Sequence, residues 1–306
     1  GDWSSDVCSS DLLLYDQPFG ADIRYPMQSN NTFSDNEYTQ QGTSVNVDTE
    51  SISMIFGLSP FTNFQLYGGA VYQSVKGDVA LRGNSYSEAF NGYDAKFKQN
   101  HAVGWLAGLS YQIPDIALKA AVTYRSKIDH DMQVTETMFG EPLDVTTPSK
   151  TTITTPQSVN IDFQTGVYKD TLAYANLRWV NWKDFHIRPT QFGAVTEYLT
   201  DLISKGSYTG GFDLDSYQKD QWAATLGIGH QFTEKWSAST EVSWDSGTGN
   251  PASTLNPTKG SWGLGLGVQF NPAENYFIAG GIKYFWLGDV VAEDGTYYIP
   301  VAGIKP

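Results

Sequence analysis

Side chains alternate between apolar and polar, residue by residue, in several segments of this chain. Between Trp236 and Asp245, Trp, Ala, Thr, Val and Trp alternate with Ser, Ser, Glu, Ser and Asp. Between Ser261 and Phe270, large apolar residues alternate mainly with glycine, and similar alternation occurs at 118–125 and 159–164. Because successive side chains of a β-strand point to opposite faces, these segments predict strands with one apolar and one polar or small face.

The connections between the eleven candidate strands alternate in length. Short turns are expected at Ser59–Asn63, Pro114–Asp115, Lys169–Asp170, Thr233–Lys235 and Asn271–Asn275. Long connections are expected at Ala21–Ser44, Arg82–Asn100, Met138–Ser149, Arg188–Tyr217 and Ser246–Lys259. Short and long connections take turns along the chain, as in an up-and-down barrel that has tight turns at one rim and long loops at the other. The sequence therefore predicts an all-β, antiparallel, transmembrane β-barrel.

The composition fits this class and excludes others. Aromatic residues make up 14% of the chain, with 9 Trp and 18 Tyr, and there are 30 Gly, which suits strands with aromatic girdles. No apolar run reaches the roughly 20 residues that a spanning helix needs, so a helical membrane protein is excluded. The formal net charge is -14 and basic residues are not clustered, so nucleic acid is not expected as a partner.

The first twelve residues are treated apart from the barrel. Gly1–Leu12, with the sequence GDWSSDVCSSDL, resembles a translated sequencing-library adapter, and we expect it to be non-native. The barrel domain then comprises residues 13–306. The single cysteine, Cys8, lies in the adapter-like segment, so no disulfide or thiol chemistry is predicted.

Five segments together resemble one family. Thr155–Gly166, with the sequence TPQSVNIDFQTG, and the preceding Gly104–Met132 are similar to adjoining segments of the FadL-type outer-membrane proteins, the long-chain fatty acid and hydrocarbon transporters. Leu177–Phe185, Gln231–Trp236 and Tyr15–Pro26 resemble further segments of the same family. The resemblance extends over nearly everything after Leu13.

This resemblance implies a monomeric fourteen-stranded barrel with an N-terminal hatch in the outer membrane of a Gram-negative bacterium. The ligand would be a long-chain fatty acid or another hydrophobic small molecule, and the surroundings outer-membrane lipid and lipopolysaccharide. In the family, ligand enters by a surface groove and leaves sideways through a gap at an inward kink of the third strand. By this resemblance the chain runs from the third to the thirteenth strand, without the hatch, the first two strands and the last strand.

The kink is expected at Gln17, Pro18, Phe19 and Gly20. Proline cannot donate a hydrogen bond to a strand ladder, and glycine carries no side chain to pack, so this pair bends or opens a sheet. The alternative is an ordinary strand end before a long loop.

Cations near the long loops are candidate contacts for a ligand carboxylate. They are Arg24, Lys76, Arg82 and Lys219. The resemblance places the family's two cationic contacts near Val79 and Leu214, so neither is reproduced, and Arg82 and Lys219 are the nearest substitutes. The alternative for each is a charge that faces solvent or lipopolysaccharide.

A short amphipathic helix is predicted within the fourth long connection, at Ala194–Ser204. Its apolar side chains fall on one helical face and are Val195, Tyr198, Leu199, Leu202 and Ile203. Tyr198, Leu199, Leu202 and Ile203 are candidates for the surface groove. The alternative is a helix that simply covers the barrel mouth.

Catalysis is not expected. The four histidines, His101, His130, His186 and His230, lie in separate segments with no nucleophile motif near them, and no metal-ligand spacing is present. We therefore predict no cofactor and no enzyme activity. The predicted function is passive uptake of hydrophobic molecules, and the alternative is a general-diffusion porin or a structural barrel.

Overall fold

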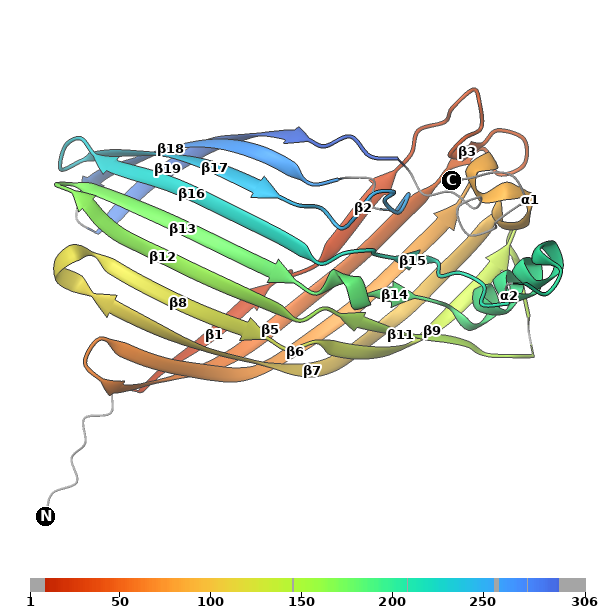
Figure 1. Ribbon diagram of the computed structural model, residues 1–306, viewed down its shortest axis with the longest axis horizontal. Helices are drawn as coiled ribbons and strands as arrows, with labels where there is room; N and C mark the ends of the chain where they lie inside the picture. Colours follow the sequence, from red (N-terminus) through yellow and green to blue (C-terminus); the bar gives the residue numbers. More distant parts are fainter. Residues whose placement is uncertain (1–8, 145, 208, 256–258, 274, 292–306) are drawn as a thin grey trace, which may run out of the picture.

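One antiparallel sheet dominates the computed structural model, which describes residues 9–144, 146–207, 209–255, 259–273 and 275–291. Its main path contains eleven strands, each paired with the next (Figure 1). They are β1 (Ser9–Asp16), β5 (Ser44–Phe61), β6 (Phe64–Leu81), β7 (Tyr93–Ile113), β8 (Leu118–Arg125), β12 (Ser158–Tyr168), β13 (Thr171–Val180), β16 (Gln221–Gln231), β17 (Trp236–Asp245), β18 (Ser261–Ala273) and β19 (Tyr276–Leu287). The predicted number and orientation of strands are confirmed. Ser9–Leu12, the end of the adapter-like segment, lie in β1, and Cys8 lies outside the described residues.

Shorter elements extend or decorate this path. Four strands join the sheet beside longer ones, and they are β2 (Gly20–Arg24), β9 (Ile128–Met138), β10 (Glu141–Pro142) and β11 (Ser149–Thr155). Two small ribbons pair β3 (Ser34–Asp35) with β4 (Gln41–Gly42) and β14 (His186–Ile187) with β15 (Asp215–Ser216). The helices are η1 (Asn84–Tyr86), α1 (Ser87–Phe90), η2 (Pro114–Ile116), η3 (Trp182–Asp184) and α2 (Thr190–Ser204). None of the helices in the described ranges is long and apolar enough to cross a bilayer.

The two rims of the sheet differ, as the connection lengths predicted. Short turns join the strands at one rim, called here the turn end, and α1, α2 and the long connections lie at the other, called the loop end (Figure 1). Two predicted boundaries were wrong: Ala21–Arg24 belong to β2 and not to the long connection after it, and the connection that begins at Arg82 ends at Gly92, because β7 begins at Tyr93. Residues 93–97 are already paired with both β6 and β9, so this part of the chain has strand neighbours that its sequence does not reveal.

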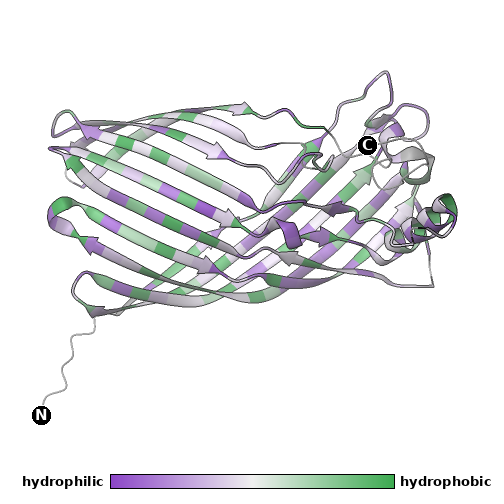
Figure 2. Ribbon diagram, in the orientation of Figure 1, coloured by the Kyte–Doolittle hydropathy of each residue, from purple (hydrophilic) through white to green (hydrophobic). Residues whose placement is uncertain are grey.

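In the turn-end half, apolar side chains face outward. Trp244, Trp262 and Ile282 are 37%, 57% and 76% exposed, so they are not packed between two sheets. Bands of hydrophobic and hydrophilic residues alternate along the strands (Figure 2). This exposure excludes a soluble sandwich, whose apolar faces would be buried against each other.

In the loop-end half, apolar side chains face inward and form a core. Its buried members are Val45, Val75, Val79, Leu81, Phe90, Tyr93, Ala95, Phe97, Met132, Val134, Ile153, Ile187, Phe192, Leu214 and Leu255. They come from β5, β6, β7, β9, β11 and β14, together with α1, α2 and two loops. The loop end is therefore closed over by packed side chains.

Strand irregularities separate the two halves. Residues 17–19 separate β1 from β2, both of which pair with β5, and so interrupt that ladder. Two residues of β7, at 98–99, lie opposite one residue of β6. Residues 126–127 separate β8 from β9, and residues 156–157 separate β11 from β12 directly opposite. At these positions the wall changes direction, as β-bulges and breaks allow.

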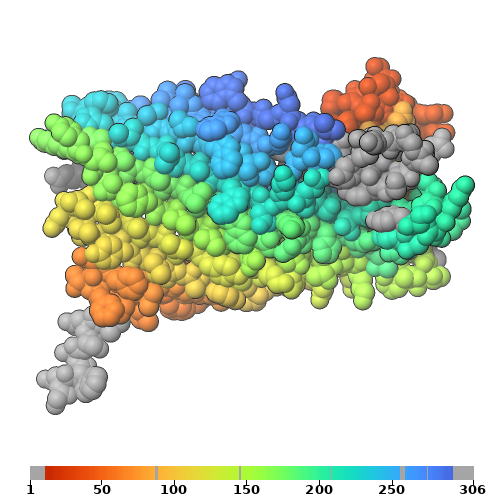
Figure 3. Space-filling view, viewed as in Figure 1, coloured from red at the N-terminus to blue at the C-terminus, as the bar shows by residue number. Residues whose placement is uncertain are grey.

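Segments far apart in the chain meet at the loop end. The Tyr25 hydroxyl donates a hydrogen bond to the Thr254 carbonyl at 2.7 Å, and the Tyr86 hydroxyl donates to Thr254 Oγ1 at 2.9 Å. Within the described residues, β1 and β19 each pair with a neighbour on one side. Seen from outside, the wall follows chain order strand by strand (Figure 3).

Candidate functional site

An apolar cavity of about 100 Å³ lies inside the loop-end half, next to the interruption between β1 and β2. The residues that line it are Phe19, Gly20, Ala21, Val45, Val47, Thr49, Val75, Lys76, Gly77, Val79, Phe97, Met132, Ile153, Thr155, Pro156, Trp182, Phe185, Ile187, Leu214, Asp215, Tyr217 and Leu255. Six strand segments contribute, because β5, β6, β7, β9 and β11 curve around it and β2 closes one side. The cavity suits a hydrophobic molecule, since most of its wall cannot form hydrogen bonds.

The predicted kink is a defined break in the ladder. Asp16 pairs with Ser51 and Gly20 with Asp48, so three residues of one strand lie opposite two of the other. The Phe19 backbone N–H donates to Thr49 Oγ1 at 3.0 Å, and the Thr49 hydroxyl donates to the Phe19 carbonyl. One side chain thus replaces the ladder bonds that the irregular backbone cannot make.

Four aromatic rings form a cluster beside this break. The Phe19 ring meets Trp182 edge to face at 5.5 Å between centroids. Trp182 also contacts Phe185 at 5.2 Å and Tyr217 at 5.0 Å, and Phe185 lies 5.3 Å from Tyr217. The cluster therefore joins the interrupted strand to the segments that follow β13 and precede β16.

A second space of about 700 Å³ lies on the other side of these rings. It is lined by Pro18, Phe19, Gly20, Ala21, Ile23, Arg178, Val180, Trp182, Tyr217, Gln221, Ala223 and Asp245. Arg178, Gln221 and Asp245 give it a polar, charged wall. This space, called here the mid-lumen, therefore has a mixed wall, in which these polar groups lie beside apolar residues such as Ile23 and Val180.

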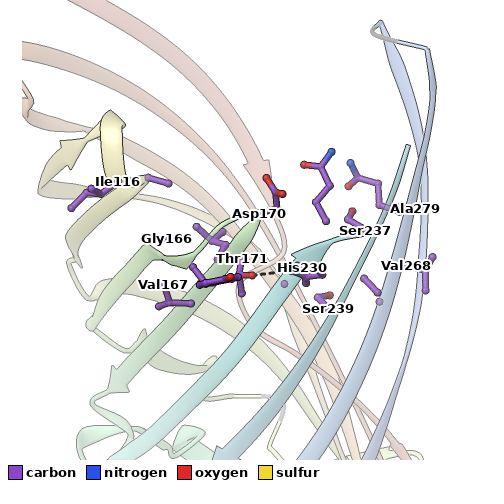
Figure 4. A pocket seen from close by; sticks show the side chains of 18 of the residues that line it. Ile116, Gly166, Val167, Asp170, Thr171, His230, Ser237, Ser239, Val268 and Ala279 are labelled. Carbon is purple, nitrogen blue, oxygen red and sulfur yellow. Dashed lines mark hydrogen bonds between the residues drawn. The ribbon is translucent and has the colours of Figure 1, made fainter. Parts of the chain in front are cut away.

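The described part of the wall surrounds a wide space at the turn end. An opening of about 1020 Å³ is lined there by turn residues, among them Ile116 and Asp170, and by the ends of β12, β13, β16, β17, β18 and β19 (Figure 4). Thr171 Oγ1 and His230 Nδ1 share a hydrogen bond of 2.8 Å at its wall. His230 thus has a structural partner from the neighbouring strand, and the opening is wide and mixed in polarity.

Arg82 does not reach the cavity. Its side chain is buried, and its guanidinium donates to Asp94 at 2.7 Å and to the carbonyls of Leu81 and Tyr93 at 2.8 and 3.0 Å. Such charge-assisted bonds are strong, so this group ties β6 to β7 at the loop end.

The other three predicted cations have different positions. Arg24 is 73% exposed and pairs with Asp22 at 3.1 Å. Lys76 contributes to the cavity lining, but its ammonium pairs with Asp48 at 3.4 Å and both side chains are more than half exposed, so the charged group lies on the outer face. Lys219 is exposed near Tyr217, and its backbone N–H donates to the Thr248 carbonyl at 2.9 Å.

The predicted helix is present and longer than expected, because α2 begins at Thr190. Its apolar residues divide between two faces: Leu199 packs against the loop-end core, whereas Tyr198, Leu202 and Ile203 are 67%, 60% and 44% exposed. The four groove candidates are therefore not brought together on one surface of the helix.

A buried carboxylate holds this helix to the wall. Glu136 of β9 accepts hydrogen bonds from the backbone N–H groups of Gln191 and Phe192 at 3.1 and 2.8 Å, and from the Tyr93 hydroxyl at 2.7 Å. A negative charge at a helix N-terminus is stabilising, because it satisfies free N–H groups and the helix dipole. Burial and the adjacent Glu136 raise the pKa of the Tyr93 hydroxyl, so Tyr93 remains a donor.

Sequence reasoning missed several residues of the site. Thr49, Trp182, Phe185 and Tyr217 were not singled out in the sequence, although the Trp182 ring lies between the two internal spaces. The aromatic density of 179–185 was a usable signal, but alternation cannot orient a residue in the turn that follows a strand.

Solved structures with the same architecture are transport barrels. A FadL homologue from Pseudomonas aeruginosa matches with a TM-score of 0.65 and 14% identity, over 92% of this chain and 67% of that one. The toluene transporter TbuX of Ralstonia pickettii matches with a TM-score of 0.59 and 12% identity, over 90% of this chain and 72% of that one. The toluene transporter TodX of Pseudomonas putida matches with a TM-score of 0.53 and 12% identity, over 89% and 72%. No family model matches the chain, and no curated protein does.

Proposed function

We propose that this chain, which has the FadL-type barrel fold, belongs to a protein that takes up hydrophobic small molecules through the outer membrane of a Gram-negative bacterium. Its substrates are long-chain fatty acids or similar hydrophobic molecules, and movement is passive. The observation that carries this proposal is the apolar cavity beside an interrupted strand, inside a wall whose outer face is apolar.

The lengths of the connections at the two rims give the orientation of the barrel in the membrane. Short turns face the periplasm and long loops face outward in bacterial barrels of this kind, so the apolar cavity is on the extracellular side. The exposed apolar side chains of the turn-end half then contact lipid. Lipopolysaccharide surrounds the outer part of the wall, and the protein acts as a monomer.

We place the exit at the interruption formed by Gln17, Pro18, Phe19 and Gly20. Phe19 and Gly20 line the cavity, and the ladder is replaced there by the side chain of Thr49. A hydrophobic ligand that leaves sideways at this point enters the bilayer without crossing the polar mid-lumen. We place the entry near α2, where Tyr198, Leu202 and Ile203 are exposed and Leu199 packs inward.

A fatty acid and an uncharged hydrocarbon place different demands on the site, because only the fatty acid carries a carboxylate. Arg24, Lys76 and Arg82 each form an ion pair with an aspartate, so a carboxylate would compete with a resident anion at any of them. Lys219 remains as a candidate for a fatty-acid carboxylate near Tyr217. An uncharged molecule such as toluene, which TbuX and TodX transport, needs no cation.

Two measurements on the purified full-length protein test this proposal. Mass spectrometry identifies any bound ligand, and planar-bilayer recording measures the ion conductance. We expect a bound hydrophobic molecule and small currents. A large, steady and unselective current with no bound ligand would instead identify a general-diffusion porin.

A further inference from the structure

We infer that His130 is a proton-sensitive switch beside the apolar cavity: when the buried ring takes up a proton, the cavity binds an uncharged hydrophobic ligand less tightly. The effect on affinity rests on the proposed function, because it concerns a ligand in the same cavity. The proton equilibrium of the ring is independent of that function and can be measured without ligand.

The His130 ring lies in the layer of side chains next to the cavity. It is fully buried and points to the inside of the wall from β9. Met132, two residues along the same strand, and Ile153, which pairs with His130 in the ladder between β9 and β11, both line the cavity. Because residues two apart on a strand share a face, and paired residues do too, the ring adjoins the cavity wall.

Both nitrogens of this ring face side-chain oxygens. Nδ1 lies 3.1 Å from Asn100 Oδ1, and Nε2 lies 3.1 Å from Gln73 Oε1. The amide nitrogens of these two residues have other partners. Asn100 Nδ2 donates to the Asp131 carbonyl at 2.9 Å, and Gln73 Nε2 donates to Ser51 Oγ at 3.0 Å. Since only the charged imidazole has two N–H donors, this arrangement suits the protonated ring.

A neutral ring requires a different arrangement of the same side chains. If Nδ1 keeps its proton and donates to Asn100, Nε2 is an acceptor that faces the oxygen of Gln73, which is unfavourable. A half-turn of the Gln73 amide brings its nitrogen to Nε2 and its oxygen to Ser51, whose hydroxyl can then donate. The layer therefore satisfies either protonation state, at the cost of moving one amide and a few hydroxyl protons.

Thr155 connects this layer to the cavity, because its side chain lines the cavity wall. Its hydroxyl donates to Gln73 Oε1 at 2.8 Å, and the Ile128 carbonyl lies 3.3 Å from the same hydroxyl oxygen. When the Gln73 amide turns, the Thr155 hydroxyl accepts from Gln73 and donates to Ile128. The protonation state of the ring thus reaches a residue that a ligand would contact.

Two titratable side chains lie near the ring, Asp129 of β9 and His101 of β7, and both are exposed. In the part of the chain that the structure describes, the side chains that face the ring from β5, β6, β7 and β11 are the uncharged Ser51, Gln73, Asn100 and Thr155. The outer face of β9 is polar, with Asp129 and Asp131 exposed, so His130 lies outside the part of the wall that contacts lipid.

Burial and hydrogen bonding act on this ring in opposite directions. Burial lowers the pKa of His130, and Asp129 raises it. The two acceptor oxygens also favour the charged form. Opposing effects of this kind leave the charge of a histidine responsive to pH in the range of about 5 to 8.

The direction of the effect on affinity follows from solvation. A hydrophobic ligand in the cavity removes water from the neighbourhood of the ring, and a charge is costly where water is excluded. An uncharged ligand therefore binds better next to the neutral ring. Because such coupling is reciprocal, a bound ligand in turn lowers the pKa of His130.

The experiment measures toluene binding to the purified full-length protein in detergent between about pH 8 and about pH 5. We expect the dissociation constant to rise several-fold as the pH falls. His130→Gln keeps an amide that donates and accepts but does not titrate, so its affinity should stay constant. The matched control is His101→Gln, because this exposed ring stacks on Tyr72 at 5.5 Å, and the variant should keep the pH dependence.

An equal pH dependence in the unsubstituted protein and in His130→Gln would overturn the switch. Should His130→Gln fail to assemble, nitrogen NMR of the histidine-labelled, unsubstituted protein decides. The chain has four histidines, so substitution of the other three assigns the signals of His130. We expect these signals to titrate in the same pH range and toluene to shift their midpoint to lower pH; a midpoint that bound toluene does not move would overturn the switch.

The same measurements separate this inference from the proposed function. If toluene binds equally well at every pH, the function stands and the switch fails. If neither toluene nor a long-chain alcohol binds at any pH, the proposed function fails. Titration of His130 together with a change in the Gln73 amide signals then supports the proton switch, and their absence overturns it.

Discussion

The two ends of β5 obey the same alternation with opposite chemistry. Toward the turn end, Ile52, Met54, Phe56 and Leu58 are about half exposed on the outer face, while Ser51 and Ser53 are buried inside. Toward the loop end, Asp48 and Glu50 face outward, while Val45 and Val47 face the cavity. The apolar side of one continuous strand therefore changes from outside to inside near Thr49.

The alternation of apolar and polar residues shows only that the segment is a strand. Which face is apolar shows what surrounds that part of the strand. Outward apolar residues indicate contact with lipid, and inward ones indicate a packed core within a wall that faces water. Polar side chains fill the interior just below the change: the Gln73 amide donates to Ser51 Oγ at 3.0 Å, and Gln73 Oε1 and His130 Nε2 lie 3.1 Å apart. The contact between the Phe19 and Trp182 rings lies beside this change.

The largest expected effect is on the loop-end core. Phe97→Ala should lower the free energy of unfolding by about 3–5 kcal/mol, because a buried ring is replaced by a cavity. Phe56→Ala, on the outer face of the turn-end half, should cost clearly less, since lipid can fill the space. Urea unfolding in lipid vesicles measures both, and equal losses would contradict the division into two environments.

A cation added to the outer face should destabilise the turn-end half more than the loop-end half, the reverse of the effect of removing a core ring. Leu266→Arg places a cation at the middle of β18, where lipid contact makes the cost about 2–4 kcal/mol. The matched change is Thr152→Arg on the outer face of β11, where the new cation lies beside Asp131. If both variants unfold at the same urea concentration, the outer face of β18 does not contact lipid.

A smaller, local effect is expected for α2. Glu136→Gln removes the buried charge at the N-terminus of this helix and should weaken its attachment by about 1–2 kcal/mol. Faster hydrogen–deuterium exchange of the α2 amides would show the loss. Glu197→Gln, at an exposed position of the same helix, serves as the control, and identical exchange in both variants would argue against the cap.

The smallest effect concerns Lys76. Lys76→Met should change the free energy of unfolding by about 0–1 kcal/mol, because its pair with Asp48 is exposed to solvent. Fatty-acid uptake into vesicles should also be unchanged. A marked loss of uptake would place the Lys76 ammonium in the binding site and would weaken the distinction between outer and inner faces at the loop end.

Parts of the site were predictable and parts were not. The interruption at Gln17–Gly20 follows from local chemistry, because proline and glycine act on their own backbone. The helix at 194–204 follows from the spacing of its apolar residues. By contrast, the inward Trp182, the clamp at Thr49 and the cap at Glu136 each depend on partners from distant strands, so no local pattern contains them.

The sequence by itself determined the strands, their alternating faces, the short and long rims and the break near Pro18. These features follow from the two-residue period of a strand and from backbone limits that each residue carries with it. Only the tertiary structure decided which side chains share an enclosed space. Strand register, bulges and curvature bring Phe19 against Trp182 and turn the charged groups of Lys76 and Arg82 away from the cavity, and these depend on the positions of many strands at once.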